Sequence, residues 1–432
     1  MKHFLSTWIK MTTIKKVLTA LLILFNLSYG LSLDEALKIA KENSPLFKSY
    51  KSGLKSVYYT YKTWFSPFLP SFKYNFSYSK YFYDSSSDYF YRNHSFVIDW
   101  ILYDSGRSII DKDLLKYTYL SEKENFKENS LDIDYYVKNA YMQCVASYQI
   151  VKFRKKILEI AKKNLEIAKK KKKLGLVKKS DILQAQVRYQ NAKYQLIRAK
   201  SDYKKALAQL NSWLGYPLDR KTKIEEKDFF AYADNDIPPY KNIEKVALEK
   251  RPVLKQLKYQ IKNAKLTSKK ILLEYTPYIY ISFAKNKSFD SLSGKSSNYS
   301  SYSISLNWNI FSGFSRYYNY LSSKEKERKA RYLLQEEKRT IKLKVYQIYT
   351  DLKASIAQLE ASKTLLEEAN LNYKQALGEY KVGTGDILSL IRAEESLASA
   401  HEVFVNSMLN VALNRIELER QLGVETLKEV SR

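Results

Sequence analysis

Strict alternation of apolar and polar residues marks several short stretches of this chain. In PSFKYNFSYSKYFY, residues 70–83, one face of a strand would carry Phe72, Tyr74, Phe76 and Tyr78, and the other Lys73, Asn75, Ser77 and Ser79. SFVIDWILY (95–103) and YSISLNWNIF (302–311) behave in the same way, and YIYISFAK (278–285) is a less regular partner. We therefore expect two strand pairs, 71–83 with 94–103 and 278–285 with 301–311.

Strands of about ten residues with aromatic side chains on one face are typical of outer-membrane β-barrels, although the edge of a soluble sandwich could show the same alternation. On the barrel interpretation the apolar face contacts lipid. The residues expected on that face are Phe72, Tyr74, Phe76, Phe96, Ile98, Trp100, Ile304, Leu306 and Trp308.

Between the strands, the chain is almost free of helix breakers. Residues 108–173 contain no Gly or Pro, so they predict one helix of about 100 Å at 1.5 Å per residue. Residues 316–381 match them with a single glycine, and shorter helices are expected at 33–66 and 242–274. The first of these shorter helices begins with a capping box formed by Ser32 and Glu35.

The second half of the chain repeats the first. A shift of 208 residues places Trp100 on Trp308 and Gly175 on Gly383. Two copies are too few for a solenoid, which needs about three, so the halves must complete one structure together. The expected divisions are a leader at 1–30, a first repeat at 31–215, a linker at 216–238, a second repeat at 239–423 and a tail at 424–432.

The glycines within the helical stretches indicate where the chain reverses. Gly175 and Gly383 follow long helical runs, where a left-handed residue often ends a helix. Asp181 and Asp386 stand where a cap could open the returning helix. We therefore expect tips of antiparallel helical hairpins near 175–180 and 383–386.

The N-terminus has the pattern of a secretory signal peptide. Several lysines precede the apolar run VLTALLILFNL at 17–27, and small residues, Ser28 and Gly30, fit a cleavage site. The alternative is an N-terminal membrane anchor, but the run is shorter than a bilayer span. Cys144 is the only cysteine, so the chain cannot form an internal disulfide.

Four strands cannot close a transmembrane barrel, because the smallest barrels have about eight. An open sheet edge within a bilayer would leave backbone groups without hydrogen bonds. Several chains must therefore contribute strands, and we expect an obligate oligomer.

Charge and motif content argue against other functions. The net charge of +29 raises nucleic acid or anionic membranes as partners. However, the basic residues are spread along the chain among glutamates, which is typical of a solvated surface, and a secreted chain is not expected to bind nucleic acid. The three histidines form no metal-spaced cluster, and no nucleotide-binding or hydrolase motif occurs. We expect no enzyme activity, no cofactor and no metal. A periplasmic coiled-coil scaffold or adhesin would explain the helices but not the strands.

The order of these motifs resembles the TolC-like outer-membrane efflux proteins over nearly the whole chain after the leader. The motifs that carry the resemblance are LSLDEALKIAKENSP, ALEKRPVLKQ, WILYDSGRS, WNIFSGFSR, LGLVKKSDILQAQ and YKVGTGDILSLIRAEES. The resemblance implies a mainly α protein with β-strands. Three chains would form a 12-stranded β-barrel in the outer membrane, continued by a periplasmic α-helical barrel. It further implies the exit duct of a tripartite efflux pump or a type I secretion system, with a periplasmic adapter and an inner-membrane transporter as partners.

The resemblance also implies roles for residues near the tips. Gly175, Leu176, Gly383 and Thr384 fall in the motif that meets the adapter. Asp181 matches an aspartate that helps to hold the periplasmic end shut.

The second tip departs from the family at three positions of this gate region. The family often has an arginine where this chain has Gly385, and aspartates where it has Ser389 and Arg392. Asp386 could partly replace their charge, but it lies three residues, nearly one helical turn, before the first of these positions, and we expect it to serve as a helix cap.

Overall fold

The structure is a computed structural model that describes residues 30–84, 87–233 and 237–429. Apart from Gly30, the expected leader at 1–30 lies outside the described residues. The chain folds into two compact units. Within the described residues, unit 1 takes 30–49, 129–251 and 341–429, and unit 2 takes 50–128 and 252–340.

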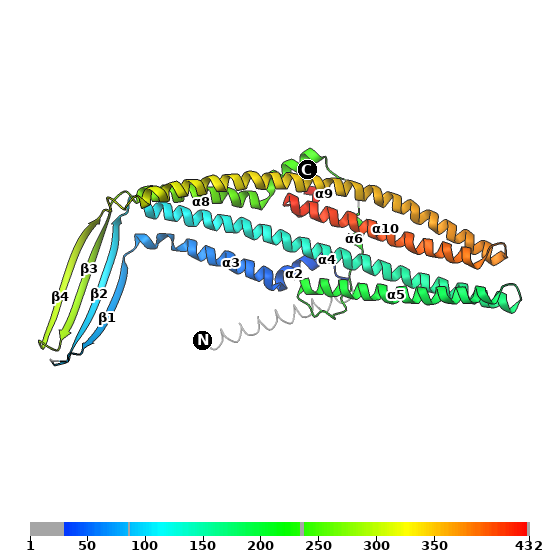
Figure 1. The fold of residues 1–432 in the computed structure, drawn as a ribbon, viewed down its shortest axis with the longest axis horizontal. Coiled ribbons are helices and arrows are strands. Elements are labelled where there is room, and N and C mark those ends of the chain that lie inside the picture. Colours follow the sequence, from blue (N-terminus) through cyan, green and yellow to red (C-terminus); the bar gives the residue numbers. More distant parts are fainter. Residues whose placement is uncertain (1–29, 85–86, 234–236, 430–432) are drawn as a thin grey trace, which may run out of the picture. The chain divides into compact units, whose positions relative to one another are not determined.

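The predicted internal repeat is confirmed, because four α-helices of the first half each have an equivalent of similar length in the second (Figure 1). The equivalent pairs are α2 (Leu33–Asn43) with α7 (Tyr240–Lys250), α3 (Pro45–Lys62) with α8 (Pro252–Leu273), α4 (Arg107–Lys173) with α9 (Ser315–Val382), and α5 (Lys179–Leu214) with α10 (Ile387–Leu422).

The helices expected at 33–66 and 242–274 are each broken by a proline. Pro45 and Pro252 begin new helices, α3 and α8. The residues before them, Ser44 (ψ 121°) and Arg251 (ψ 123°), are extended, because the proline ring disfavours the helical conformation of the preceding residue. The capping box of Ser32 and Glu35 is present at the start of α2.

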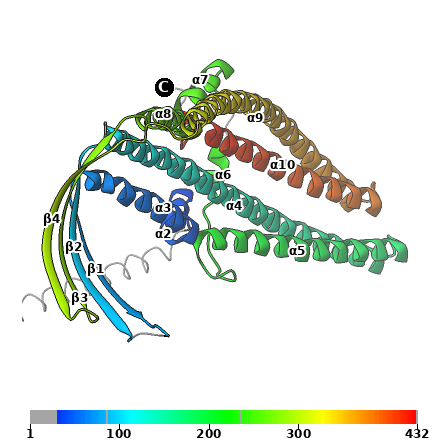
Figure 2. The same ribbon diagram turned by 60° about the vertical axis from the view of Figure 1, so that its left-hand side comes forward.

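Unit 2 contains a four-stranded antiparallel sheet in the order β1-β2-β3-β4, which is curved along its strands (Figure 2). The strands are β1 (Ser71–Tyr81), β2 (Tyr89–Tyr103), β3 (Tyr278–Asp290) and β4 (Lys295–Asn307). The mainly helical fold with four antiparallel strands is the predicted one.

The strand ends differ from the sequence expectation. β2 begins at Tyr89 rather than His94, because it pairs with β1 up to Tyr81. β3 continues to Asp290, whose carboxylate accepts a hydrogen bond from Leu292 N (2.9 Å) in a tight turn. β4 therefore begins at 295 rather than 301, and it ends at 307 rather than 311, opposite the first residue of β3.

Equivalent contacts of the two repeats connect the sheet to the helices of unit 2. The indole nitrogens of Trp100 and Trp308 donate to the carbonyls of Phe68 (3.1 Å) and Tyr275 (2.9 Å), in the segments that precede β1 and β3. Two arginines near the starts of α4 and α9 bind backbone carbonyls just after the end of α8. Arg107 Nη2 donates to Thr276 O (2.6 Å), and Arg316 Nη1 donates to Glu274 O (2.7 Å). Cations at a helix C-terminus are favourable because the helix dipole is negative there.

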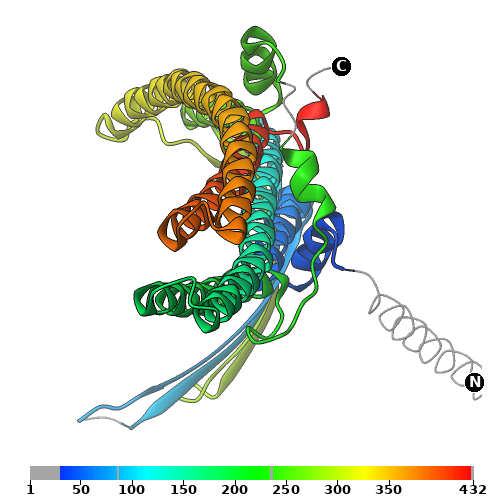
Figure 3. The same ribbon diagram turned by 90° about the vertical axis from the view of Figure 1, so that its right-hand side faces the viewer.

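Unit 1 consists mainly of two helical hairpins, the C-terminal part of α4 (from residue 129) with α5 and the C-terminal part of α9 (from residue 341) with α10 (Figure 3). The returning helices both end at a left-handed glycine, Gly215 (φ +69°) and Gly423 (φ +70°). Gly215 also lies against Asn43, and an added Cβ would approach within 2.9 Å of the Asn43 Cβ. Asn43 in turn donates to Leu214 O (3.0 Å), which ties α2 to α5.

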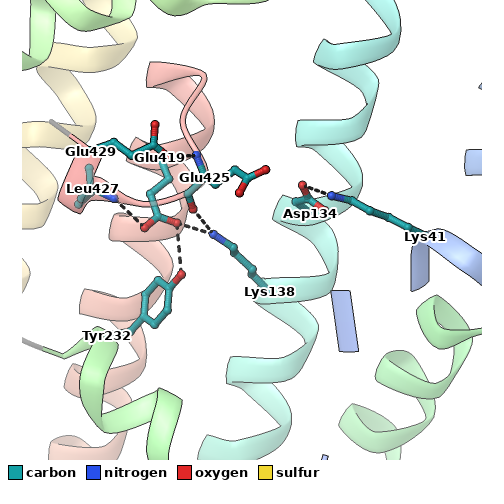
Figure 4. Close-up of polar contacts among 8 residues, drawn as sticks. All are labelled: Lys41, Asp134, Lys138, Tyr232, Glu419, Glu425, Leu427 and Glu429. Atoms are coloured by element: carbon teal, nitrogen blue, oxygen red, sulfur yellow. Dashed lines mark hydrogen bonds and ion pairs between the residues drawn. The ribbon is translucent and has the colours of Figure 1, made fainter. Parts of the chain in front are cut away.

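A buried ion pair anchors the C-terminal segment of unit 1 (Figure 4). Lys138 Nζ of α4 lies 2.7 Å from Glu419 Oε2 of α10 and 2.7 Å from Glu425 O. Leu427 N (3.2 Å) and the hydroxyl of Tyr232 (3.4 Å), from α6 (Lys227–Tyr232), also donate to the Glu419 carboxylate. Burial alone would lower the pKa of Lys138, but Glu419 outweighs this effect, so the pKa is raised and the ammonium stays charged.

Candidate functional site

The first hairpin tip turns at Gly175, which has the positive φ (+76°) expected from the sequence. Leu176 N donates to Lys171 O (3.0 Å) and Gly175 N to Lys172 O (3.0 Å), which together close a Schellman motif. Leu174 and Leu176 are 72% and 68% exposed beside the glycine. The turn therefore presents apolar side chains to solvent.

The second tip is tighter. Gly383 has φ +95°, and the amides of Gly383, Thr384 and Gly385 all donate to Glu379 O, at 3.0–3.1 Å. Gly385 has a different requirement: an added Cβ would lie 2.9 Å from the Glu379 Cβ. A longer side chain there, such as the arginine common in the family, would need the turn to change shape.

The aspartates beside the tips act at helix starts, in different ways. Asp386 is the N-cap of α10 and accepts from Ser389 N (2.7 Å), which holds the pKa of its carboxyl below its usual value. Asp181 was expected as a cap but lies one turn into α5, where its carboxylate accepts from Lys178 N (3.1 Å). It thus supplies the second half of a capping box, because its own backbone is already helical.

Within one chain, the tip residues do not form a charged latch. Ser389 and Arg392 are exposed on the first turns of α10. Among the residues that the structure describes, neither Asp181 nor Arg392 has an ion-pair partner within 4 Å. The gate roles implied by resemblance for Asp181, Gly385, Asp386, Ser389 and Arg392 stay predictions.

The two hairpins pack against one another next to their tips. Lys171 Nζ donates to the Tyr380 carbonyl and lies 4.5 Å from the centroid of that residue's ring. A buried core follows, built from all four helices. Its members are Leu165, Ala168, Ala185, Tyr373, Ala376, Tyr380, Ile387, Leu390, Ala393 and Leu397. Small alanines at these positions let the helix backbones approach closely.

Sequence reasoning missed an ion pair buried inside this core. Arg188 Nε of α5 lies 3.1 Å from Glu394 Oε1 of α10, with side-chain exposures of 6% and 0%. Asn164 of α4 donates to the other carboxylate oxygen at 3.1 Å. A signal was available, because Glu394 lies on the same helical stripe as the buried Leu390 and Leu397.

The sheet of unit 2 separates its side chains by face, as the alternation predicts. Cross-strand partners share a face, and the register pairs Phe72 with Ile98, Tyr74 with Phe96 and Ile281 with Ile304. Of the nine residues expected to face lipid, eight lie within the strands on this one aromatic face. Trp308 follows β4, and its contact with the lipid stays a prediction like the others.

The opposite face of the sheet is rich in serine and asparagine. Its two carboxylates are Asp99, which pairs with Lys73 at 2.9 Å and accepts from Ser282 at 2.7 Å, and Asp290. This is the composition expected of a water-filled lumen.

Other kinds of site find no support in the described residues. No three His, Cys, Asp or Glu side chains there are grouped so that they could hold a metal ion. Over the same residues, no helix has the length and apolarity needed to cross a bilayer. Burial raises the pKa of the Cys144 thiol to about 12, so it is not a reactive nucleophile.

Solved outer-membrane channels have the same fold. The Campylobacter jejuni CmeC outer membrane channel matches with a TM-score of 0.75 at 15% identity, over 90% of this chain and 85% of that one. The open state of the Neisseria gonorrhoeae MtrE outer membrane channel matches with a TM-score of 0.74 at 14% identity, over 91% and 89%. The Vibrio cholerae outer membrane protein VceC gives 0.73 at 14%, over 91% and 96%.

No curated protein sequence matches the chain. The sequence profile described as "Outer membrane efflux protein" matches residues 36–216 and 247–424, which are the two repeats. The chain belongs to the outer membrane efflux protein family.

Proposed function

We propose that three copies of this chain form the exit duct of a tripartite export machine, through which substrates pass from an inner-membrane transporter to the cell exterior. Family membership places the protein in the outer membrane, extending into the periplasm, as a channel rather than an enzyme. Beyond family membership, we propose the trimer, the two partner proteins and the passage of exported substrates.

The observation that carries it is the open sheet. β1 and β4 are the two edges of a sheet whose order is β1-β2-β3-β4, and one face of that sheet is aromatic. An open edge in lipid leaves backbone donors and acceptors unpaired, each of which costs several kcal/mol. Three copies would pair β4 of one chain with β1 of the next and close a twelve-stranded barrel.

The tips support the docking of an adapter. They present Leu174, Leu176 and Val382 in two turns whose backbones are shaped by Gly175 and Gly383. A partner could bury these apolar side chains and approach the glycines closely. The transporter would supply the energy, since the sequence has no nucleotide-binding motif. Drug efflux and type I protein secretion both fit this arrangement.

Two measurements on the purified protein test the proposal. We expect native mass spectrometry in mild detergent to give three chains, and the trimer to conduct ions across a planar bilayer. A stable, folded monomer without conductance would overturn the channel and favour a periplasmic scaffold.

The partners need a separate test. Cells that lack the protein should lose export of the cargo of the cognate pump, and the wild-type chain should restore it. Restoration by a chain that no longer forms trimers would contradict a duct.

A further inference from the structure

The aromatic face of the sheet carries cations but no carboxylate. Lys80, Arg92, Lys285 and Lys287 share this face by register, whereas both acidic strand residues, Asp99 and Asp290, lie on the other. The opposite face is balanced, with Lys73 and Lys295 against those two aspartates. The positive charge is therefore a property of one face and not of the sheet as a whole.

The cations lie on the half of that face that is farther from the helices. The rows nearest the helices are apolar, with Ile98 opposite Phe283 and Trp100 opposite Ile281. Lys285 lies one row further, opposite Phe96, and the rows beyond it reach the hairpin loops. The apolar band is thus shorter on β3 and β4 than on β1, which remains aromatic up to Tyr78. A slanted boundary is expected where strands tilt by about 35–45° from the membrane normal.

Three of these cations form a cluster, which we call the rim cluster: Arg92, Lys285 and Lys287. Lys285 and Lys287 are two residues apart on β3, roughly 7 Å along the strand. Arg92 pairs with Phe289, so it is the diagonal neighbour of Lys287 at roughly 7–8 Å. All three side chains are exposed.

The rim cluster lacks internal counter-ions. Lys80 has Asp88 at 3.5 Å and Lys73 has Asp99 at 2.9 Å. Within the described part of the chain, no carboxylate lies within 4 Å of the three rim-cluster cations. Like charges on neighbouring strand positions repel one another, so the arrangement favours an external anion.

Arg92 is also held in place. Its guanidinium carbon lies 5.1 Å from the Phe90 ring centroid and 5.3 Å from that of Phe289. Contacts of this kind with aromatic rings use no hydrogen bond, so the N–H donors of the guanidinium remain available. A guanidinium presented in this way can bind two oxygens of one phosphate.

We propose that the rim cluster binds phosphate groups of anionic lipids in the outer leaflet of the membrane. The inference rests on the proposed orientation, in which the aromatic face contacts lipid and the hairpin loops face the cell exterior. On that orientation the rim cluster lies at the outer edge of the apolar band, where lipid headgroups begin. Lys285, at the edge of the band, can extend its ammonium toward the headgroups while its methylenes stay in the apolar layer. A lipid phosphate is the anion found at this depth.

The test measures the retention of a defined lipid by purified trimers. The probe is bis-phosphorylated lipid A, compared with the same lipid after removal of its phosphates, and native mass spectrometry counts the bound lipids. The variant R92Q/K285Q/K287Q should retain the phosphorylated lipid roughly tenfold less well or worse. The variant K285R/K287R should behave like wild type, because it keeps the charge.

A matched variant separates local binding from loss of total charge. K51Q/K55Q/K295Q removes three exposed cations of unit 2 that lie outside the aromatic face, and it should retain lipid normally. Equal loss in both triple variants, or equal retention of the two lipids by wild type, would overturn the proposal. Displacement of the lipid by inorganic phosphate alone would also overturn it, in favour of a free-anion site. Trimers that conduct ions but show no phosphate preference would refute the lipid site and leave the channel intact, whereas failure to assemble or conduct would refute both.

Discussion

Lys138 is the one buried lysine among the residues that the structure describes. It connects α4 to α10 and to the segment that follows α10. It contacts Glu419 and the carbonyl of Glu425, while Glu419 also accepts from Leu427 N. We predict that Lys138→Met releases the segment 424–429, because it leaves a carboxylate buried without its counter-ion, which costs about 3–5 kcal/mol. Hydrogen exchange should become faster at the amides of Val424 to Glu429, with trimer yield reduced.

Adding Glu419→Gln to that variant is the control. The amide oxygen can still accept from Leu427 N, and the unpaired charge is gone. The double variant should therefore recover much of the protection. If it exchanged as fast as Lys138→Met alone, packing of the lysine stem rather than charge would hold the segment.

His401 makes the stability of the two hairpins of unit 1 depend on pH. Its ring stacks on Phe153 with centroids 3.5 Å apart, and burial, with smaller effects of Lys156 and Arg154, lowers its pKa from 6.5 to about 4. Between pH 6.5 and 4, this histidine is protonated in the unfolded chain but stays neutral in the folded chain. The free energy of unfolding therefore falls as the pH drops toward 4. Above pH 6.5 this residue contributes no pH dependence.

The prediction is that His401→Gln flattens the fall in thermal midpoint between pH 6.5 and 4, measured on trimers in detergent. His94→Gln is the matched control, because His94 is the other histidine that the structure describes and is exposed. Identical slopes for wild type and His401→Gln would show that other groups, such as the Arg154–Glu402 pair at 2.6 Å, set the acid limit.

At the scale of elements, the pattern of residues predicted what depends on local rules. The strand faces, the left-handed glycines and the capping box at Ser32 follow from spacing and backbone preference alone. Features that need a second element could not be predicted. Gly385 is needed because Glu379 of α9 approaches it closely. The face of Lys285 depends on the register of β3, because aromatic residues such as Tyr280 also lie on the opposite face of that strand.

The hairpin tips are the elements most open to mutation. Gly175→Val and Gly383→Val place a β-branched residue at positive φ, which costs roughly 1–2 kcal/mol, and the space around both Cβ positions is otherwise empty. We predict near-normal trimer yield for both variants, but weaker adapter capture and weaker export. Leu176→Asp should have the same effect by charging an exposed apolar contact.

Gly378→Val is the comparison for these changes, because Gly378 lies near the second tip, inside α9, in open space and without a positive φ. It should leave both yield and capture nearly unchanged. Normal export with all three tip variants would mean that the tips are turns without a docking role.

At the scale of the whole molecule, one chain is an incomplete object. Within the described part of the chain, the edges β1 and β4 have no further strand beside them. In the proposed trimer, assembly and membrane insertion therefore stabilise the same sheet. The trimer should therefore be sensitive to changes on one face and tolerant of equal changes on the other.

Ile304 and Ser305 test this directly, because they are adjacent in β4 and lie on opposite faces, paired with Ile281 and Tyr280. Ile304→Lys puts a cation into the band that we propose to face lipid, where it would cost about 2–4 kcal/mol near the midplane, and three copies would multiply the cost. Ser305→Lys places the same group in the polar face, which already contains Lys73 and Lys295.

We expect few trimers in the outer-membrane fraction for Ile304→Lys and a normal amount for Ser305→Lys, measured on a gel without heating the sample. Trp308→Lys should be milder than Ile304→Lys, since Trp308 lies beyond the strand end and its indole binds Tyr275 O. If Ile304→Lys and Ser305→Lys gave equal amounts of trimer, the assignment of the aromatic face to the lipid would be wrong.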